Sequence, residues 1–496
     1  MKKTGASYPW EAQKALRLRV RKAFPTMLEV LSSRPFFAAF VVVFLALHAL
    51  HLLIGLADSG DSFRSTSFLF DRPVGFDQNL YDINSEEGRR RFLTHWLDQW
   101  ILLPDAPRFD LLETFSSYKI YLGLQVLFSC ALMGEGAPYS IMVGSLLSRV
   151  IYIGGWLLLF GVLRAVLPVG LSWIPVIVLA VVSLNADFTS YFNSLYEEQL
   201  LIICMPLLAW LLYLFRRTGQ VAIGVSVLIL SAVLGASKLA FFLLPMVAAF
   251  FLFPLFSGRW ARLKFLVLVA CAQGSALQPF LEARYVEANR YHAVYYGVLQ
   301  VLTGEELQRL GSLGEKPVFP ECVGVSSFHP GGLDCLKKAQ ASYGDVLYLL
   351  ASEPVIGWRL FLRLIDDGRH LELEYLGKSL SGAPDFSQIA LFSLWQKVYT
   401  YYVNVIVGLM FLGVLFCVWR RRRLEESIGP ARLRLNPMEA VGVFLVIFGL
   451  IQYVVALGDG FFEINRHLMA GNFCLSMAFG MLLAALLSRR SVRGDA

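Results

Sequence analysis

The chain has 496 residues and a net charge of +7; 56% of its residues are hydrophobic and 16% are charged. A soluble domain averages about 45–50% apolar and about 25% charged residues, so the composition excludes an ordinary soluble enzyme, a disordered chain and a small disulfide scaffold. Apolar runs of about 20 residues recur, the length that a helix needs to cross a bilayer. They lack the alternation of a transmembrane β-barrel, so we predict an all-α, polytopic helical membrane protein.

Ten apolar runs are predicted to span the membrane. They lie at 36–57, 141–163, 171–186, 199–215, 221–236, 239–257, 265–281, 393–418, 438–457 and 468–487. Basic flanks of spans stay in the cytoplasm, and with ten spans every basic cluster and both termini fall on that side. The basic N-terminal stretch directly precedes a span and lacks interleaved aromatic residues, so no nucleic-acid partner is predicted.

The run at 118–134 is apolar, but we do not count it as an eleventh span. A crossing there would move the later basic clusters to the outside, so an interfacial or re-entrant helix is predicted instead. The resulting organisation is a basic tail at 1–35, a first span at 36–57, an outer segment at 58–140, a bundle of six helices at 141–281, a large outer loop at 282–392, three C-terminal spans at 393–487 and a cytoplasmic tail at 488–496.

Two cysteines fall in the large outer loop. Cys322 and Cys335 are expected to form a disulfide there, because an oxidising compartment allows them to pair. The alternatives are two free thiols or a zinc site. Zinc is disfavoured because a structural site needs four ligands and His329 is the one imidazole nearby; no metal site is predicted.

The segment after the first span is rich in carboxylates, including Asp61 and Asp77, with Arg64 between them. Clustered acids just outside a span suit a general base that activates an acceptor hydroxyl, although acids are also common in solvated loops. The outer loop at 187–198 combines Asn193 and Tyr196 with two adjacent glutamates, Glu197 and Glu198. Rings, an amide and carboxylates together suggest a sugar-binding edge; the alternative is that the acids interact with the helix dipole.

Cations appear in other outer segments. Lys238 lies between two apolar runs and is either a phosphate contact or an interfacial lysine that reaches toward water. Arg149 lies deeper, within a span, as a phosphate ligand or an ion-pair partner. Two further groups are candidates for binding a headgroup, a glycan or a phosphate: Arg290, Tyr291 and Tyr296 after the seventh span, and Asp459, Glu463, Arg466 and His467 in the last outer loop. Aromatic residues at such places also form interfacial belts.

Carboxylates and separated cations on the same side of the membrane fit a lipid-linked phosphosugar as substrate, because cations hold a phosphate leaving group and a carboxylate deprotonates the acceptor. The sequence resembles bacterial membrane glycosyltransferases of the GT-C type, and among them the glycan hexose transferases of cell-surface glycan assembly. The similar stretches are GDSFR (60–64), YFNSLYEEQ (191–199), SK (237–238), YHAVYYGVL (291–299) and GDGFFEINRHL (458–468).

The resemblance implies a GT-C fold and a polyprenyl-phosphate sugar as donor. It implies Asp61 as the first candidate for the base and Asp77 as the second. It also matches Glu198 to the acid after the tyrosine in the outer-loop motif. Lys238, Arg466 and His467 match the expected phosphate-side positions. The sequence departs from the family pattern at Glu197, where a small residue is expected before the acid, and this leaves the choice between Glu197 and Glu198 open.

We therefore expect an inverting glycosyltransferase of the bacterial inner membrane, with its active site facing the periplasm. The sugar is a hexose or a pentofuranose, and the acceptor is a lipid-linked glycan, O-antigen or a pilin-like protein. No cofactor is predicted, and a requirement for a divalent metal ion is left open. The alternatives are a flippase or transporter of lipid-linked glycans, an O-antigen polymerase or ligase, and a structural subunit of an export complex.

Overall fold

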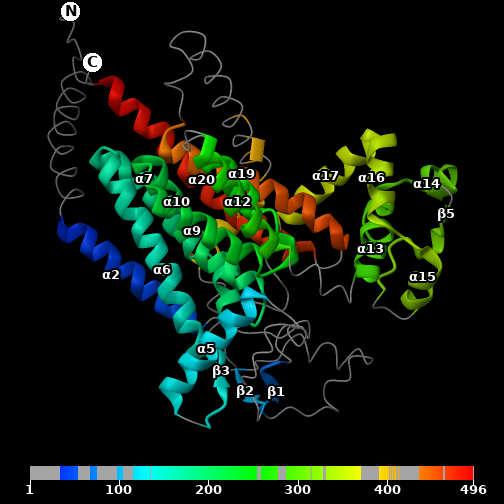
Figure 1. The fold of residues 1–496 in the computed structure, drawn as a ribbon, viewed down its shortest axis with the longest axis horizontal. Coiled ribbons are helices and arrows are strands. Elements are labelled where there is room, and N and C mark those ends of the chain that lie inside the picture. Colours follow the sequence, from blue (N-terminus) through cyan, green and yellow to red (C-terminus); the bar gives the residue numbers. More distant parts are fainter. Residues whose placement is uncertain are drawn as a thin grey trace, which may run out of the picture.

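The computed structural model describes the following residues: 34–53, 68–74, 98–103, 116–134, 136–253, 259–277, 286–313, 316–327, 331–369, 390–401, 403, 405, 407–408, 412, 435–461 and 464–494. Most of them are helical, and the strands in this part of the chain form two small antiparallel sheets (Figure 1). The prediction of an all-α membrane protein is confirmed.

Apolar helices of different lengths make up the main bundle. They are α2 (Arg34–Leu50), α6 (Ile141–Val166), α7 (Val169–Ser183), α9 (Glu198–Thr218), α10 (Val221–Gly235), α11 (Leu244–Leu252), α12 (Arg259–Ala276), α19 (Pro437–Ala456) and α20 (Ile464–Gly494). The helices α19 and α20 form an antiparallel hairpin whose backbones approach closely at Gly449, where an added Cβ would lie 2.9 Å from a carbon of Leu475. Small residues at such crossings are typical of helices that pack within membranes.

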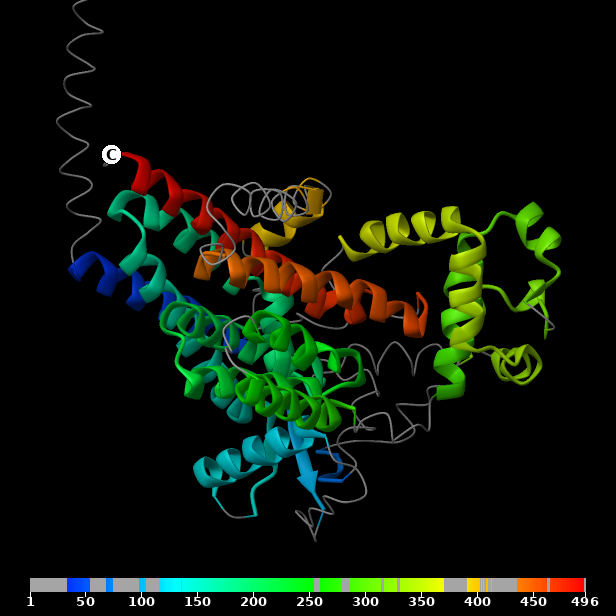
Figure 2. The ribbon, with the colours of Figure 1, turned by 45° about the horizontal axis from the view of Figure 1, so that its top comes forward.

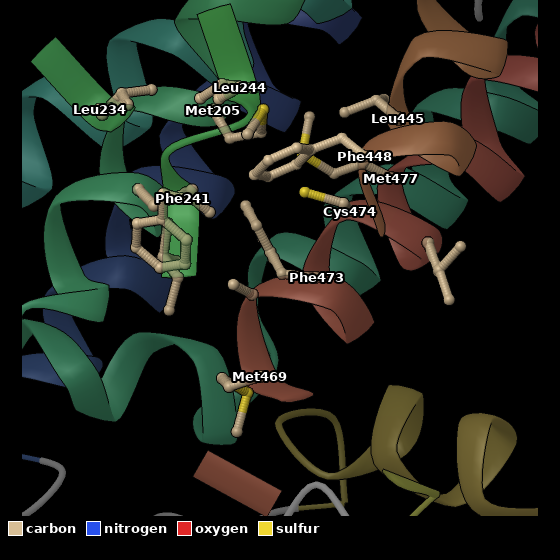
Figure 3. Close-up of a cluster of buried hydrophobic side chains, with 14 of the residues drawn as sticks. Met205, Leu234, Phe241, Leu244, Leu445, Phe448, Met469, Phe473, Cys474 and Met477 are labelled. Atoms are coloured by element: carbon tan, nitrogen blue, oxygen red, sulfur yellow. The ribbon is translucent and has the colours of Figure 1, made fainter. Parts of the chain in front are cut away.

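Apolar side chains fill the space between α9, α11, α19 and α20. Figure 3 shows Met205, Phe241, Phe448 and Phe473 among the buried side chains of this region, with Cys474 and Met477 beside Phe448. Many of these side chains are completely buried. This core fixes α9 against the α19–α20 hairpin and therefore fixes the ends of these helices relative to one another.

Ten spans were predicted for the whole chain, and the structure allows helix length and hydropathy to be compared for the described part of it. In the described part of the chain five meet the requirements of length and hydropathy: Arg34–Leu53, α6, α9, α19 and Ile464–Ser488. A sixth is reached if Gly170–Ser183 and Ala186–Asn193, bent by 51°, are one broken span. With 15 residues α10 is about 22 Å long and falls short of the ~30 Å of hydrocarbon. The predicted span at 393–418 is described only in part, at 393–401, 403, 405, 407–408 and 412.

The run at 118–134 forms a separate short helix, α5 (Ser117–Met133). One face packs on α6, while Leu124, Leu127 and Leu132 are more than half exposed. It projects from the bundle beside a three-stranded sheet (Figure 2) of β1 (Phe70–Pro73), β2 (Gln99–Leu102) and β3 (Tyr139–Ser140). A short helix with an exposed apolar face is typical of an interfacial position, which stays a prediction.

The loop predicted at 282–392 contains a small helical region that we call the cap. Its elements are α13 (Val286–Tyr295), η7 (Val298–Val301), α14 (Gly304–Leu310), β4 (Ser312–Leu313), β5 (Lys316–Pro317), η8 (Pro320–Cys322), α15 (Gly332–Ala339), α16 (Tyr343–Ser352) and α17 (Pro354–Gly368). The structure contains the expected disulfide between Cys322 and Cys335, which joins η8 to α15.

The cap docks on η11 (Leu457–Asp459), the short connection between α19 and α20. The amide of Phe461 donates to the carbonyl of Tyr296 at 2.9 Å. Gly460 has φ +63° and ψ −146°, a conformation that is open essentially to glycine alone. An added Cβ there would lie 2.4 Å from the carbonyl oxygen of His292. Glycine therefore permits the contact between α13 and the connection.

We expect Gly460→Ala to loosen the cap, because both backbone strain of about 1–3 kcal/mol and a clash with a main-chain oxygen oppose it. The apparent Tm of the detergent-solubilised protein should fall. Gly458→Ala is the matched control, because nothing lies within 4 Å of an added Cβ there. Equal melting temperatures for the two variants would contradict this account of the docking.

Candidate functional site

Three charged side chains, far apart in sequence, meet at one end of the bundle. Glu198 is the first residue of α9, Lys238 directly precedes η4 (Leu239–Phe241), and Arg466 lies in the first turn of α20. Gln452 near the end of α19 donates to the carbonyl of Ala240 at 3.1 Å, which ties η4 to the hairpin. The fold thus brings together residues from two separate predicted outer loops and from a break between two apolar runs.

The carboxylate of Glu198 is buried, with 2% of the residue exposed. Lys238 Nζ donates a hydrogen bond to Glu198 Oε1, and Arg466 Nε lies 3.6 Å from the same oxygen. The Arg466 guanidinium also stacks over the ring of Tyr196, with Cζ 5.2 Å from the ring centroid. We call Glu198, Lys238, Arg466 and Tyr196 the Glu198 cluster.

The electrostatics of the Glu198 cluster favour an additional anion. The N-terminal end of a helix attracts negative charge, and it binds phosphate groups in many proteins. Arg466 lies in the first turn of α20 and so adds a cation to an end that is already positive. Lys238 and Arg466 both contact Glu198, so the donors of two cations lie close together here. A phosphate with two charges could use donors of both Lys238 and Arg466.

Gln199 holds the loop before α9 in a compact form. Its Nε2 donates to the carbonyls of Tyr191, Phe192 and Ser194 at 2.9–3.1 Å. Its Oε1 accepts a hydrogen bond from Gln125 of α5 at 3.1 Å. These bonds place Glu198 at the start of α9 and bury the preceding aromatic residues.

The sugar-binding edge predicted at 187–198 is therefore corrected for Asn193 and Tyr196. Asn193 is completely buried and Tyr196 is 4% exposed. The Asn193 Oδ1 atom accepts a hydrogen bond from Arg149 Nη2 at 3.0 Å, and the same nitrogen donates to the carbonyl of His51 at 2.8 Å. Asn193 thus joins the end of the first span to α6. Glu197, directly before α9, is only partly buried, and Glu198 is the glutamate that contacts the two cations.

Two buried histidines beside Arg149 were missed by the sequence analysis. His48 and His51 are at most 1% exposed, and their rings are 5.4 Å apart. In the described part of the chain no hydrogen-bond partner reaches any of their ring nitrogens, or Nε and Nη1 of Arg149. The sequence did contain a pattern that indicates this pair: the two histidines lie three residues apart, on the same face of a helix, at the end of the first span. Buried polar groups of this kind commonly bind internal water.

The residues predicted after the seventh span belong to the cap. Arg290 is exposed, whereas Tyr291 is buried and its hydroxyl donates to the carbonyls of Cys322 and Val325 at 3.1 and 2.8 Å. Burial raises the pKa of Tyr291 to about 12. Tyr296 accepts the hydrogen bond from Phe461 described above. Tyr291 and Tyr296 thus stabilise the cap, which corrects the prediction of a binding surface for Tyr291.

Several predicted residues cannot be placed in the site. Asp61, Arg64, Asp77 and Glu463 lie outside the described residues, as does the side chain of Asp459. His467 follows Arg466 in the first turn of α20 and is partly buried. Among the residues that the structure describes, no group of three His, Cys, Asp or Glu side chains is arranged to hold a metal ion.

The fold and this site define a polytopic, all-α membrane protein with a charged cluster at one end of its helical bundle. The chain belongs to the family of the YfdI N-terminal transmembrane domain, whose model matches residues 22–495. It is similar to the uncharacterized protein YfdI of Escherichia coli (strain K12), with 23% identity over 411 residues that cover 78% of this chain and 85% of that protein. No solved structure matches.

We expect Lys238→Met to lower the apparent Tm, because breaking a buried ion pair costs about 3–5 kcal/mol. Lys316→Met is the matched control: its partner is Asp345 at 3.0 Å and its side chain is 37% exposed, so a loss of about 0–1 kcal/mol is expected. Equal losses for the two lysine variants would be inconsistent with a buried pair.

Asn193→Ala should destabilise the fold by about 1.5–3 kcal/mol, the range for a hydrogen bond to a charged group. Asn193→Asp retains the oxygen that accepts from Arg149 and should be milder. The comparison is made by thermal unfolding in detergent. An aspartate variant as unstable as the alanine variant would show that the bond to Arg149 is not what Asn193 contributes.

Proposed function

We propose that this protein is a membrane glycosyltransferase that moves one sugar from a polyprenyl-phosphate donor to an acceptor at the outer face of the bacterial inner membrane. The observation that carries the proposal is the Glu198 cluster, in which two cations from different elements flank one buried carboxylate. The cluster belongs to the end of the bundle where the predicted outer segments begin. The polyprenyl chain would lie along the apolar helices beside it.

In this proposal Lys238 and Arg466 bind the phosphate of the donor. Arg466 offers several N–H donors in a planar array that suits phosphate oxygens, and Lys238 adds a mobile point charge. Glu198 keeps both side chains in place before the donor arrives and shares them with the phosphate afterwards. Stabilising the leaving phosphate is worth most where water is excluded, and all three side chains are largely buried.

The reaction is a single displacement at the anomeric carbon. A carboxylate removes the proton from the acceptor hydroxyl, the oxygen bonds to the anomeric carbon, and the bond from that carbon to the phosphate oxygen breaks. The configuration inverts and the polyprenyl phosphate leaves with the negative charge. Asp61 is the first candidate for the base and Asp77 the second, as the resemblance to GT-C enzymes implies.

The covalent chain allows Asp61 to reach the cluster. It follows Leu53 by eight residues, which span at most about 26–29 Å when fully extended. The carbonyl of Leu52 is 3.5 Å from Nδ2 of Asn193, so the end of the first span lies beside the loop that leads to Glu198.

A transporter of lipid-linked sugars could use the same charged cluster, but it would leave the bond between sugar and phosphate intact.

The test is sugar transfer in membranes from a deletion strain that carries the wild-type gene or a variant. We expect Asp61→Asn to abolish transfer from a synthetic polyprenyl-phosphate sugar, and Arg466→Gln to raise the donor concentration required by at least about tenfold, the equivalent of 1.4 kcal/mol. Lys316→Met, whose ion pair lies in the cap, should behave as wild type. Immunoblots must show equal amounts of each variant in the membrane.

Three results would count against the proposal. Transfer by Asp61→Asn at the wild-type rate would remove this residue as the base. An unchanged donor requirement in Arg466→Gln would remove the phosphate role of the cluster. Movement of intact donor across the membrane by the wild-type protein, without cleavage to polyprenyl phosphate, would favour a flippase.

A further inference from the structure

The cap helix α17 has three distinct faces. One face is buried through Ile356, Leu360 and Leu364. A second bears Arg359 and Arg363, which contact other parts of the cap: Arg359 Nη1 lies 2.8–2.9 Å from both carboxylate oxygens of Glu306, and Arg363 Nη2 lies 3.0 Å from Gln300 Oε1.

The third face of α17 is apolar and exposed. Val355, Trp358 and Leu362 are 58%, 61% and 47% exposed. Their spacing places them on one side of the helix. Exposed apolar stripes that contain a large aromatic side chain usually contact a partner. Whether this partner is lipid or protein depends on where the stripe lies relative to the spanning helices.

Contacts at the C-terminal end of α17 place it beside the spanning part of α20. Asn472 Nδ2 donates to the carbonyl of Gly368 at 2.8 Å, and a Cβ added to Gly368 would lie 2.8 Å from Leu468. Leu468 and Asn472 follow the first residue of α20 by four and eight residues, or about 6 and 12 Å along the helix. Gly368 therefore lies at a level inside the apolar segment of α20.

The middle of α17 lies at the level of the connection between α19 and α20. The Arg363 guanidinium stacks on Phe461 of that connection, with Cζ 4.0 Å from the ring centroid. Trp358 precedes Arg363 by five residues, or about 7–8 Å along the helix. The polar layer on each side of the hydrocarbon is about 5–8 Å thick, so Trp358 and Leu362 fall at the depth where tryptophan side chains concentrate.

We infer that the C-terminal end of α17 enters the membrane from the cap and that Trp358 and Leu362 contact lipid in the headgroup layer. This changes the interpretation of 282–392 from an outer loop to a region that is partly inserted. Figure 2 shows α17 extending from the cap toward the α19–α20 hairpin. Lipid is the partner because the C-terminal end of the same helix packs against α20, which is long and apolar enough to span the membrane. The inference does not depend on glycosyl transfer.

The test compares tryptophan emission of the wild-type protein and Trp358→Phe in phosphatidylcholine vesicles. The difference between the two spectra isolates Trp358, which is exposed and therefore tolerates the substitution. Vesicles whose lipids are brominated near the headgroup should quench this difference emission several-fold more strongly than aqueous iodide does. Trp100, which is completely buried in the protein, gives the matched control through Trp100→Phe, and its difference emission should resist both quenchers.

Two outcomes would overturn the inference. Stronger quenching of Trp358 by iodide than by brominated lipid would place the stripe in water. Protection of Trp358 from both quenchers would mean that a protein surface, such as a second copy of the chain, covers it. If Trp358→Phe is not recovered in folded form, a spin label at Leu362→Cys answers the same question, because oxygen collides with lipid-facing labels and water-soluble nickel complexes collide with labels in water.

Discussion

A buried carboxylate is stable only if nearby cations compensate its charge, and Glu198 obtains this compensation from two elements that are distant in sequence. Lys238 contributes from the break before η4 and Arg466 from the start of α20. Because the three helix ends must meet for both cations to reach Glu198, the Glu198 cluster fixes which ends of α9, η4 and α20 lie together. The apolar core between the same helices supplies the packing that holds this arrangement.

The polar residues around the cluster act mainly as structural supports. Gln199 donates hydrogen bonds to three backbone carbonyls, and Arg149 joins Asn193 to the end of the first span. Backbone groups that are shielded from water must form hydrogen bonds within the protein. The buried, irregular loop before α9 therefore needs side chains such as Gln199 to pair with its carbonyls. The result is a fixed loop that presents Glu198 and Tyr196 to Arg466, with Asn193 fully occupied in its own contacts.

The sequence predicted some parts of this arrangement correctly because their causes are local. Composition determines the helical membrane class, and two cysteines in the same outer loop were enough to predict their disulfide. Glu198, Lys238 and Arg466 were identified as candidates because charged residues between apolar runs are costly without partners. These three residues fall at the same end of the bundle because successive helices run through it in opposite directions.

Other features depend on contacts that no local pattern reveals. The burial of Asn193 depends on Arg149, and that of Tyr291 on carbonyls of a loop more than 30 residues later. Hydropathy measures apolar content and gives no helix length: the run predicted at 221–236 forms the 15-residue helix α10, and the run that follows Lys238 is divided between η4 and α11. The insertion of α17 could not be predicted because its exposed stripe alternates with charged residues that pair within the cap.

Everything proposed about function requires that the end of the bundle with the Glu198 cluster faces away from the cytoplasm. The direct measurement is the labelling of single cysteines in intact cells with a membrane-impermeant maleimide, after the free native cysteines have been replaced. A cysteine at Glu287, exposed on the cap helix α13, should be labelled, whereas one at Gln220, exposed between α9 and α10, should react only after the membrane is permeabilised. Labelling of Gln220→Cys but not Glu287→Cys in intact cells would contradict the account.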